Sequence, residues 1–186
     1  MSAATRKPQR HPSVPCQSLT RVHYFAGRLL SAEDLAAEQA YLREKFRRHN
    51  RTFHQSGIVD GLEVALESHE VRVGPGLALD AAGNEICVPV AQRAALPSTP
   101  GEAYVVLRYK EIGINPIPVV GLAGEVSPDP APSRIQESFE IVFERPGGTQ
   151  CSTSPSDSTS SIRLARLRSV RGSWRLDVRF RRPWAK

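Results

Sequence analysis

The hydrophobic pattern changes from a helical period to a strand period near residue 57. Between residues 31 and 56, the large apolar side chains recur at intervals of seven, four and seven residues, which keeps them on one stripe of a helix. These residues are Leu35, Leu42, Phe46 and Phe53, with Gln39 and His49 as polar interruptions. After Gly57, apolar and polar residues alternate in short runs that glycine and proline separate, as in strands and turns. The pattern predicts an α+β fold in which one long N-terminal helix precedes a mostly antiparallel β domain, sandwich- or barrel-like.

Local signals set the boundaries of the predicted helix. Ser31 as N-cap and Asp34 three residues later form a capping-box pattern, so the helix begins here. Acidic residues crowd its first turns and basic residues its last, which complements the helix macrodipole. These are Glu33, Asp34 and Glu38 at the start and Arg47, Arg48 and Arg51 at the end. Gly57 is expected to end the helix.

The apolar stripe is expected to be the folding nucleus of the chain. Four apolar residues ahead of the helix, Tyr24, Phe25, Leu29 and Leu30, form an aromatic clamp that we expect to pack where the helix meets the rest. If the ring of Phe46 is buried, its replacement by alanine costs about 3–5 kcal/mol.

Several strands are predicted from period-two alternation. Residues 77–80 and 85–88 flank a turn and are expected to form a hairpin. Residues 104–109 are apolar enough for a central strand. Residues 139–143 place three apolar side chains on one face. The final strand is expected to run through residues 174–180, with Trp174, Leu176, Val178 and Phe180 on its buried face.

The domain organisation follows from composition along the chain. Residues 1–20 are rich in Pro, Ser and Arg and are expected to form a flexible arm. The clamp and helix occupy residues 21–56, and the β domain occupies residues 57–186. Within the β domain, the proline-rich residues 112–133 and the Gly-, Ser- and Thr-rich residues 146–161 are expected to be long loops.

Charge is distributed unevenly along the 186 residues, whose formal net charge is +6. Residues 1–30 have five basic and no acidic side chains, residues 57–145 have six basic and thirteen acidic, and residues 146–186 have nine basic and two acidic. Such blocks suit contacts between neighbouring subunits. Three widely spaced cysteines, no signal region and no membrane-spanning run indicate a cytoplasmic protein with reduced thiols.

The sequence holds no pattern typical of an enzyme, a cofactor site or a metal site. It has no C-x-x-C pair, no nucleophile elbow and no phosphate-binding glycine loop. His49 and His54 are five residues apart, about 140° around a helix, and are expected to diverge. We therefore predict no catalytic residue, no cofactor and no metal.

Basic side chains are the remaining candidates for a site. Arginines and a lysine lie around the helix at positions 43, 45, 47, 48 and 51, and arginines at 175, 179, 181 and 182 are expected to line the final strand. One interpretation is contact with a nucleic-acid backbone, with Trp174, Phe180 and Trp184 as stacking partners. The acidic middle of the chain argues against it, and a protein interface is favoured instead. The predicted interface residues are Tyr24, Phe25, Arg47, Arg48, Arg51, Arg175, Arg179 and Arg181.

The chain resembles a bacterial family encoded in phage-tail-like contractile injection clusters. The likeness begins with YFAGRLLSAEDLAAEQAYLREKFRRHNRTFHQSGIVDGLEV from Tyr24 to Val64. It continues in order through VRVGPGLALDAAGNEICV, YVVLRYKE, SRIQESFEI and a closing RRP. The start of the chain also resembles, less closely, that of the type VI secretion baseplate adaptor, in which an aromatic-Gly-Leu turn introduces a helix.

This resemblance implies a structural component near the baseplate or fibre attachment of a contractile particle. Its implied partners are baseplate, tube, sheath or fibre proteins, and a homo-oligomer is a further possibility that the sequence leaves open. Family members often have cysteine where this chain has Asp60 and the pair Ala81-Ala82, so no cysteine-based metal role is expected here. The alternative function is a basic nucleic-acid-binding module.

Overall fold

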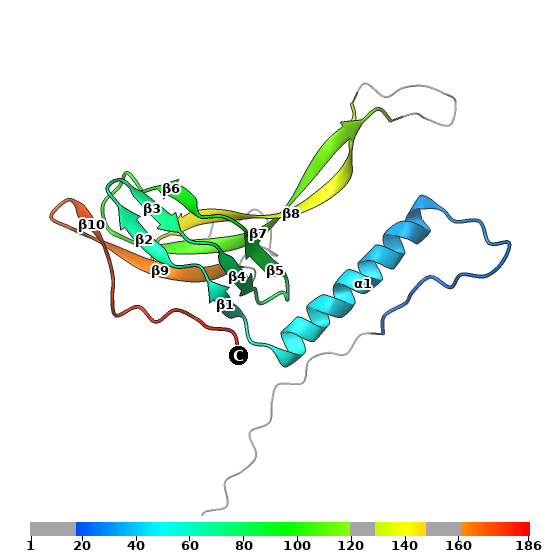
Figure 1. Cartoon of the computed structure of the whole chain (residues 1–186), viewed down its shortest axis with the longest axis horizontal. Coiled ribbons are helices and arrows are strands. Elements are labelled where there is room, and N and C mark those ends of the chain that lie inside the picture. The colour runs from blue at the N-terminus through cyan, green and yellow to red at the C-terminus, as the bar shows by residue number, and fades with distance from the viewer. Residues whose placement is uncertain (1–17, 120–128, 148–160) are drawn as a thin grey trace, which may run out of the picture. The chain divides into compact units, whose positions relative to one another are not determined.

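A computed structural model describes residues 18–119, 129–147 and 161–186 (Figure 1). The chain divides into two compact units, residues 1–45 and 46–186, and helix α1 runs from the first into the second. The elements in order are α1 (Ala32–Phe53), β1 (Gly57–Gly61), β2 (Val64–Glu67), β3 (Glu70–Val73), β4 (Gly76–Leu79), β5 (Glu85–Val88), β6 (Gln92–Ala95), β7 (Glu102–Ile117), β8 (Ala131–Glu144), β9 (Ser161–Val170) and β10 (Ser173–Leu176). Among the described residues, no helix has both the length and the apolar character needed to cross a bilayer.

The strands form three antiparallel sheets, which confirms the α+β prediction. Their strand orders are β1-β4-β5, β2-β3-β6 and β10-β9-β7-β8. Side chains from all three sheets meet in one core of buried aliphatic residues. This core comprises Ile58, Leu62, Val71, Val73, Ala78, Ile86, Val88, Val105, Leu107, Ile162, Leu164, Ala165 and Leu167. Burial of this apolar surface is the main stabilising contribution of the β domain.

The predicted hairpin and central strand are present. β4 and β5 pair from Gly76 opposite Val88 to Leu79 opposite Glu85. The buried carboxylate of Asp80 closes the turn between them by accepting hydrogen bonds from the backbone and side-chain amides of Asn84, at 2.8 and 2.7 Å. β7 lies between β9 and β8, so residues 104–109 are central in their sheet as predicted.

The predicted loop over residues 112–133 is wrong at both of its ends. β7 continues to Ile117 and β8 begins at Ala131, and the two strands form a ribbon that extends beyond β9 (Figure 1). Near the end of this ribbon Pro116 lies opposite Pro132. The two strands pair on either side of these prolines, at Ile114 opposite Arg134 and at Ile117 opposite Ala131, so proline content did not indicate a loop here. Residues 120–128 lie outside the described residues.

The predicted final strand is only half correct. Trp174 and Leu176 pack against the core as expected, but β10 ends at Leu176 and Val178 is 95% exposed. Asp177 diverts the chain, because its backbone carbonyl accepts a hydrogen bond from the amide of Phe180 and its carboxylate accepts one from the amide of Arg179, both at 3.0 Å.

The prediction that Gly57 ends the helix is also wrong. α1 ends at Phe53, and Gly57 begins β1. The last residues of the chain run beside β1, where the amide of Ile58 donates to the carbonyl of Pro183 (2.7 Å) and the amide of Ala185 donates to the carbonyl of Ile58 (2.8 Å). A Cβ on Gly57 would lie 2.6 Å from backbone atoms of Trp184 and Ala185. Gly57 is therefore required for the close approach of the C-terminal segment.

The apolar stripe of the helix is exposed, contrary to prediction. No residue of α1 is buried, and Phe46 is 68% exposed. The clamp ahead of the helix is exposed as well, with Leu29 at 92%. The pattern identified an apolar face correctly, but no part of the described chain covers that face.

Two predicted segments and two cysteines fall largely on residues that are not described. Residues 1–17 include most of the predicted arm and Cys16, and residues 148–160 include most of the second predicted loop and Cys151. Cys87 is an exposed free thiol.

These observations predict that stability depends on the sheet core and not on the helix stripe. We expect Leu107→Ala to lower the free energy of unfolding by about 2–5 kcal/mol, because Leu107 is fully buried. At a concentration where the chain is monomeric, we expect Phe46→Ala to change it by no more than ~0.5 kcal/mol, because the ring is exposed and loses few contacts. Urea unfolding of both variants measures the difference. Equal losses would show that Phe46 is covered in solution.

Candidate assembly surface

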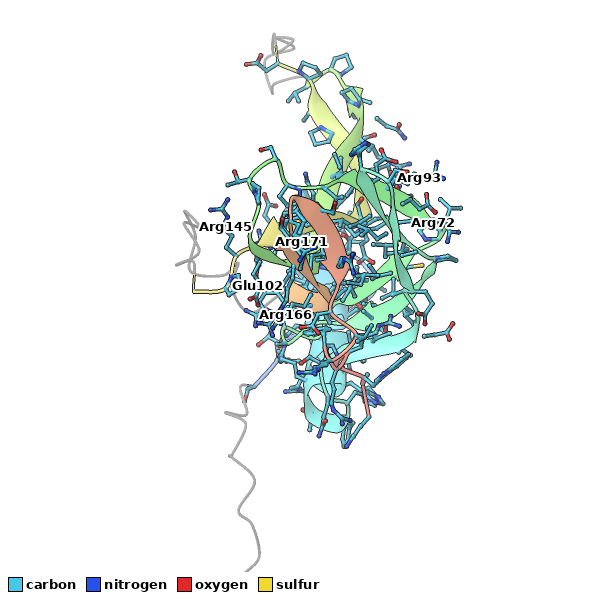
Figure 2. All side chains as sticks on the ribbon, turned by 90° about the vertical axis from the view of Figure 1, so that its left-hand side faces the viewer. Arg72, Arg93, Glu102, Arg145, Arg166 and Arg171 are labelled. Atoms are coloured by element: carbon cyan, nitrogen blue, oxygen red, sulfur yellow. The ribbon has the colours of Figure 1, made fainter. Side chains whose placement is uncertain are left out.

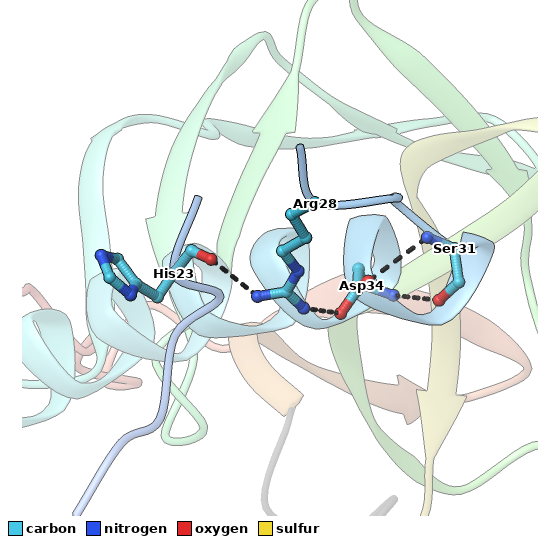
Figure 3. A network of polar contacts seen from close by, with 4 residues as sticks. All are labelled: His23, Arg28, Ser31 and Asp34. Atoms are coloured by element: carbon cyan, nitrogen blue, oxygen red, sulfur yellow. Dashed lines mark hydrogen bonds and ion pairs between the residues drawn. The ribbon is translucent and has the colours of Figure 1, made fainter. Parts of the chain in front are cut away.

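A polar network fixes the start of α1 (Figure 3). The amide of Asp34 donates to the hydroxyl of Ser31 (3.2 Å) and the amide of Ser31 donates to the carboxylate of Asp34 (3.3 Å), which confirms the predicted capping box. The guanidinium of Arg28 binds that carboxylate at 2.6 Å and donates to the carbonyl of His23, also at 2.6 Å. Arg28 thereby ties the clamp segment to the helix start and leaves Tyr24 and Phe25 exposed.

The exposed residues of α1 form an apolar seam with the spacing of a coiled coil. Intervals of four and three residues alternate along it, so its members occupy the a and d positions of three successive heptads. Leu35, Leu42 and His49 take the d positions and Gln39, Phe46 and Phe53 the a positions, and all six are exposed. A helix that shows such a row to solvent has the surface of a partner-binding helix.

The C-terminal half of α1 is held on the turn between β4 and β5. The side-chain amide of Asn50 donates to the carbonyl of Gly83 (2.9 Å), and the guanidinium of Arg51 donates to the carbonyl of Ala82 (2.8 Å). Gly83 has a φ of +87°, and a Cβ there would lie 2.2 Å from the carbonyl oxygen of Arg47. Only glycine permits this contact between the turn and the helix backbone.

Arg47 extends the attachment to the base of the β7–β8 ribbon. Its guanidinium lies 3.6 Å from the carboxylate of Glu111 and 5.9 Å from the ring centre of Tyr109. The hydroxyl of Tyr109 donates to the same carboxylate at 2.9 Å. Burial raises the pKa of Tyr109, and the hydrogen bond to Glu111 and the charge of Glu137 raise it further. Tyr109 therefore remains a neutral donor here at physiological pH.

Three of the predicted interface arginines therefore already have partners within the chain. Arg47 and Arg51 bind the β domain, and Arg48 also has an intrachain contact. The face that holds the β domain is about 120° around the helix axis from the seam. The helix is thus attached to the β domain by polar residues. The expectation that its apolar stripe packs against the rest of the chain is wrong.

The C-terminal arginines remain available. Arg175, Arg179 and Arg181 are exposed, and within the described chain their guanidinium groups form no ion pair. They do not line one strand as predicted, because only Arg175 lies on β10. Arg182, the fourth basic residue of this segment, has a structural role. Its guanidinium donates to the carbonyls of Gly61 (2.8 Å) and Leu62 (2.7 Å) and to the carboxylate of Glu63 (2.9 Å).

Sequence reasoning missed a cluster on the outer face of the sheet that contains β7 and β9. The ring of Tyr104 lies 4.4 and 5.9 Å from the guanidinium groups of Arg163 and Arg166, and 5.9 Å from the ring of Phe180. Phe180 was predicted to face the core. This prediction is wrong, because its ring lies against Tyr104 instead. Arg166 also pairs with Glu102 and Asp177. The alternation of residues 102–108 was the signal that marked Tyr104 as outward-facing.

Basic side chains do not gather on a single face of the β domain. Figure 2 shows Glu102 and Arg166 on one side of it and Arg72 and Arg93 on the opposite side. Acidic neighbours accompany both groups: Glu67 lies 3.1 Å from Arg93, and Asp177 lies 3.7 Å from Arg166. This mixed distribution differs from the continuous basic stripe of a nucleic-acid-binding surface.

The histidine prediction needs correction. The rings of His49 and His54 are 5.4 Å apart and do not diverge, because α1 ends at Phe53 and His54 no longer follows the helical rotation. In residues 18–119, 129–147 and 161–186, no group of three or more metal-binding side chains occurs.

Structures from type VI secretion are among the solved structures that share this fold. Similarity to the crystal structure of TssK has a TM-score of 0.53 at 15% identity and covers 86% of this chain and 41% of that chain. Similarity to the baseplate complex of the type VI secretion system has a TM-score of 0.55 at 14% identity and covers 90% of this chain and 42% of that chain. Similarity to the cryo-electron microscopy structure of the TssK-TssF-TssG baseplate subcomplex has a TM-score of 0.53 at 16% identity. It covers 89% of this chain and 62% of that chain.

The likeness to these baseplate structures concerns the fold. This chain spans less than two thirds of the length of each chain that it matches. No family model matches the sequence, and no curated protein matches it either. The sequence resemblance at the start of the chain is accompanied by a likeness in fold to type VI secretion baseplate structures that covers 86–90% of this chain.

The contact between Gly83 and α1 yields a prediction with a matched control. Gly172 has a similar φ of +80°, but a Cβ there would meet no atom within 4 Å. We expect Gly172→Ala to cost only the strain of positive φ, about 1–2 kcal/mol. Gly83→Ala should cost at least about 1 kcal/mol more, because the methyl group collides with the helix backbone. Urea unfolding compares the two, and equal losses would contradict the contact.

Proposed function

We propose that this chain is an assembly protein of a phage-tail-like contractile injection particle. It would dock between neighbouring subunits near the baseplate or the fibre attachment and assemble there from the cytoplasm. The observation that carries the proposal is α1: its apolar seam is exposed from end to end on a chain with the fold of TssK. The role is structural, and it needs no catalytic residue, cofactor or metal.

The exposed seam supports an assembly role because it is incomplete in one chain. Leu35, Leu42, Phe46 and Phe53 are large apolar residues that the described chain leaves in water. Covering such a side chain contributes about 1.5–3 kcal/mol. A protein that functioned alone would gain nothing from this row, whereas a subunit that joins others would use it to bind them.

For the seam we propose α1 of a second copy as occupant. The alternating spacing of the seam fits another helix with the same spacing, and an identical helix supplies it. In a parallel pair, Glu38 at a g position would lie beside Arg43 at an e position of the other copy, with opposite charges. Gln39 and His49 are polar members of the seam that fix which residues lie opposite each other.

Baseplate, tube, sheath or fibre proteins are the proposed partners of the exposed arginines. Arg175, Arg179 and Arg181 have no acidic partner among the described residues, so an acidic surface on a neighbouring subunit suits them. One exposed ion pair contributes only about 0–1 kcal/mol. Several together determine orientation and partner choice more than affinity.

A nucleic-acid-binding module has less support. Of the proposed stacking residues, Trp174 packs against the core and Phe180 packs against Tyr104. Trp184 lies beside the guanidinium of Arg182, at 5.1 Å from its ring centre. A salt-resistant complex with a defined DNA or RNA sequence would favour this alternative over the assembly role.

The seam predicts self-association that a charge in the seam abolishes. We expect the double variant Leu42→Glu, Phe46→Glu to sediment as a monomer at concentrations where the parent chain associates, because carboxylates cannot be buried unpaired between helices. The control Ala37→Glu, Ala40→Glu adds the same charge at exposed positions outside the seam and should associate like the parent. At concentrations where the parent is monomeric, both should melt like the parent. If the seam variant keeps the parent's mass, the second copy is not the occupant.

The assembly role itself predicts a loss of incorporation when the basic residues are reversed. We expect Arg179→Glu, Arg181→Glu to leave the melt unchanged and to lower the amount of this chain in purified particles, more at low salt, where repulsion is least screened. Arg21→Glu, Arg145→Glu makes the same charge change at other exposed arginines and should leave incorporation unchanged. Full occupancy of the first variant would mean that these arginines are only solvated.

A further inference from the structure

We propose that the outer edge of β8 accepts an extended segment of a partner protein, in which apolar residues alternate with lysine or arginine. β8 is fourteen residues long and is the edge strand of its sheet. The other described edges are shielded: β2, β5, β6 and β10 have only four residues each, and the chain end at Pro183–Ala185 runs along β1. Short or covered edges resist pairing, so among the described strands β8 offers the longest run of unpaired backbone groups.

The register identifies which backbone groups of β8 face outward. The carbonyl of Gly101, just before β7, accepts a hydrogen bond from the amide of Ser169 of β9 at 2.7 Å. Backbone groups alternate in direction along a strand, so odd-numbered residues of β7 face β9 and even-numbered residues face β8. Even residues of β7 lie opposite even residues of β8, as in Lys110 opposite Ser138. The outward groups therefore belong to odd residues of β8: Ile135, Glu137, Phe139, Ile141 and Phe143.

The side chains of β8 determine which residues suit an added strand. On the face shared with the core, Phe139, Ile141 and Phe143 are only partly buried, and Ile135 is 59% exposed. Apolar side chains of an added strand would complete that cover. The opposite face carries Glu140, whose carboxylate lies 3.8 Å from Arg108 and 4.0 Å from Lys110, at the limit of ion pairing. A lysine or arginine from the added strand would give it a closer partner.

The charge of the edge disfavours a second copy as the added strand. β8 carries three carboxylates, Glu137, Glu140 and Glu144, against one guanidinium, Arg134. Two β8 edges that paired with each other would bring both sets of carboxylates together, and like charges opposite one another destabilise a sheet. Glu137 already lies opposite Glu111 within the ribbon. Lysine or arginine side chains of the proposed segment lie on the face of Glu140 and bring opposite charge there, so the charge favours a heterologous partner.

The test uses the full chain and two labelled decapeptides, one of alternating valine and lysine and one of alternating valine and glutamate. We expect fluorescence anisotropy to show saturable binding of the lysine peptide only. Glu137→Pro removes an outward amide without touching a ladder bond, and should weaken binding about tenfold. The matched control Glu137→Thr makes the same charge change and keeps the amide, so it should bind several-fold better than the proline variant.

Hydrogen exchange on the parent chain provides a readout that needs no variant. Binding of the lysine peptide should slow exchange at the amides of Ile135, Phe139 and Ile141. No binding of either peptide, or equal binding by the proline and threonine variants, would overturn the proposal. So would unchanged exchange at those three amides. Self-association that Glu137→Pro abolishes would make a second copy the occupant and overturn it as well. None of these outcomes depends on a role in a particle, so the two proposals fail separately.

Discussion

The contact between Gly83 and the backbone of Arg47 determines how the helix can be used. Because the turn approaches the helix backbone directly, the face of α1 with Asn50 and Arg51 is committed to the β domain. The apolar row is then left on another face of the same helix. A polar attachment of this kind gives up the stabilisation that burial of Phe46 or Phe53 would supply, and leaves both rings exposed.

The sequence was sufficient for the elements and insufficient for their partners. Period-two alternation and the capping box located the strands and the helix start, because both signals depend on residues near one another in the chain. The same reasoning assigned the helix stripe to the core, which was wrong. A row such as Leu35, Leu42 and Phe46 shows that a face needs cover, but its period is the same whether the cover comes from the same chain or another one.

The other errors arose where one residue outweighs a pattern. Trp174 to Phe180 alternates like a strand, yet Asp177 ends β10 by bonding two backbone amides beyond it. Pro116 and Pro132 read as loop residues, yet they lie opposite each other in a ribbon with free edges. For the candidate site, the exposed C-terminal arginines were predictable from charge. The engagement of Arg47 and Arg51 was not, since their partners are far away in the sequence.

The described chain leaves three surfaces exposed: the seam of α1, the edge of β8 and the C-terminal arginines. Each suits a partner of different chemistry. The seam of α1 offers apolar side chains and selects by shape and spacing, whereas the edge of β8 offers backbone groups and accepts many sequences. Charge restricts which strand the edge of β8 accepts, because Glu140 favours basic residues on that face of an added strand. The exposed arginines from Arg175 to Arg181 favour an acidic surface instead. Since an apolar helix, a basic strand and an acidic surface are three separate requirements, the three proposed contacts do not compete for one surface.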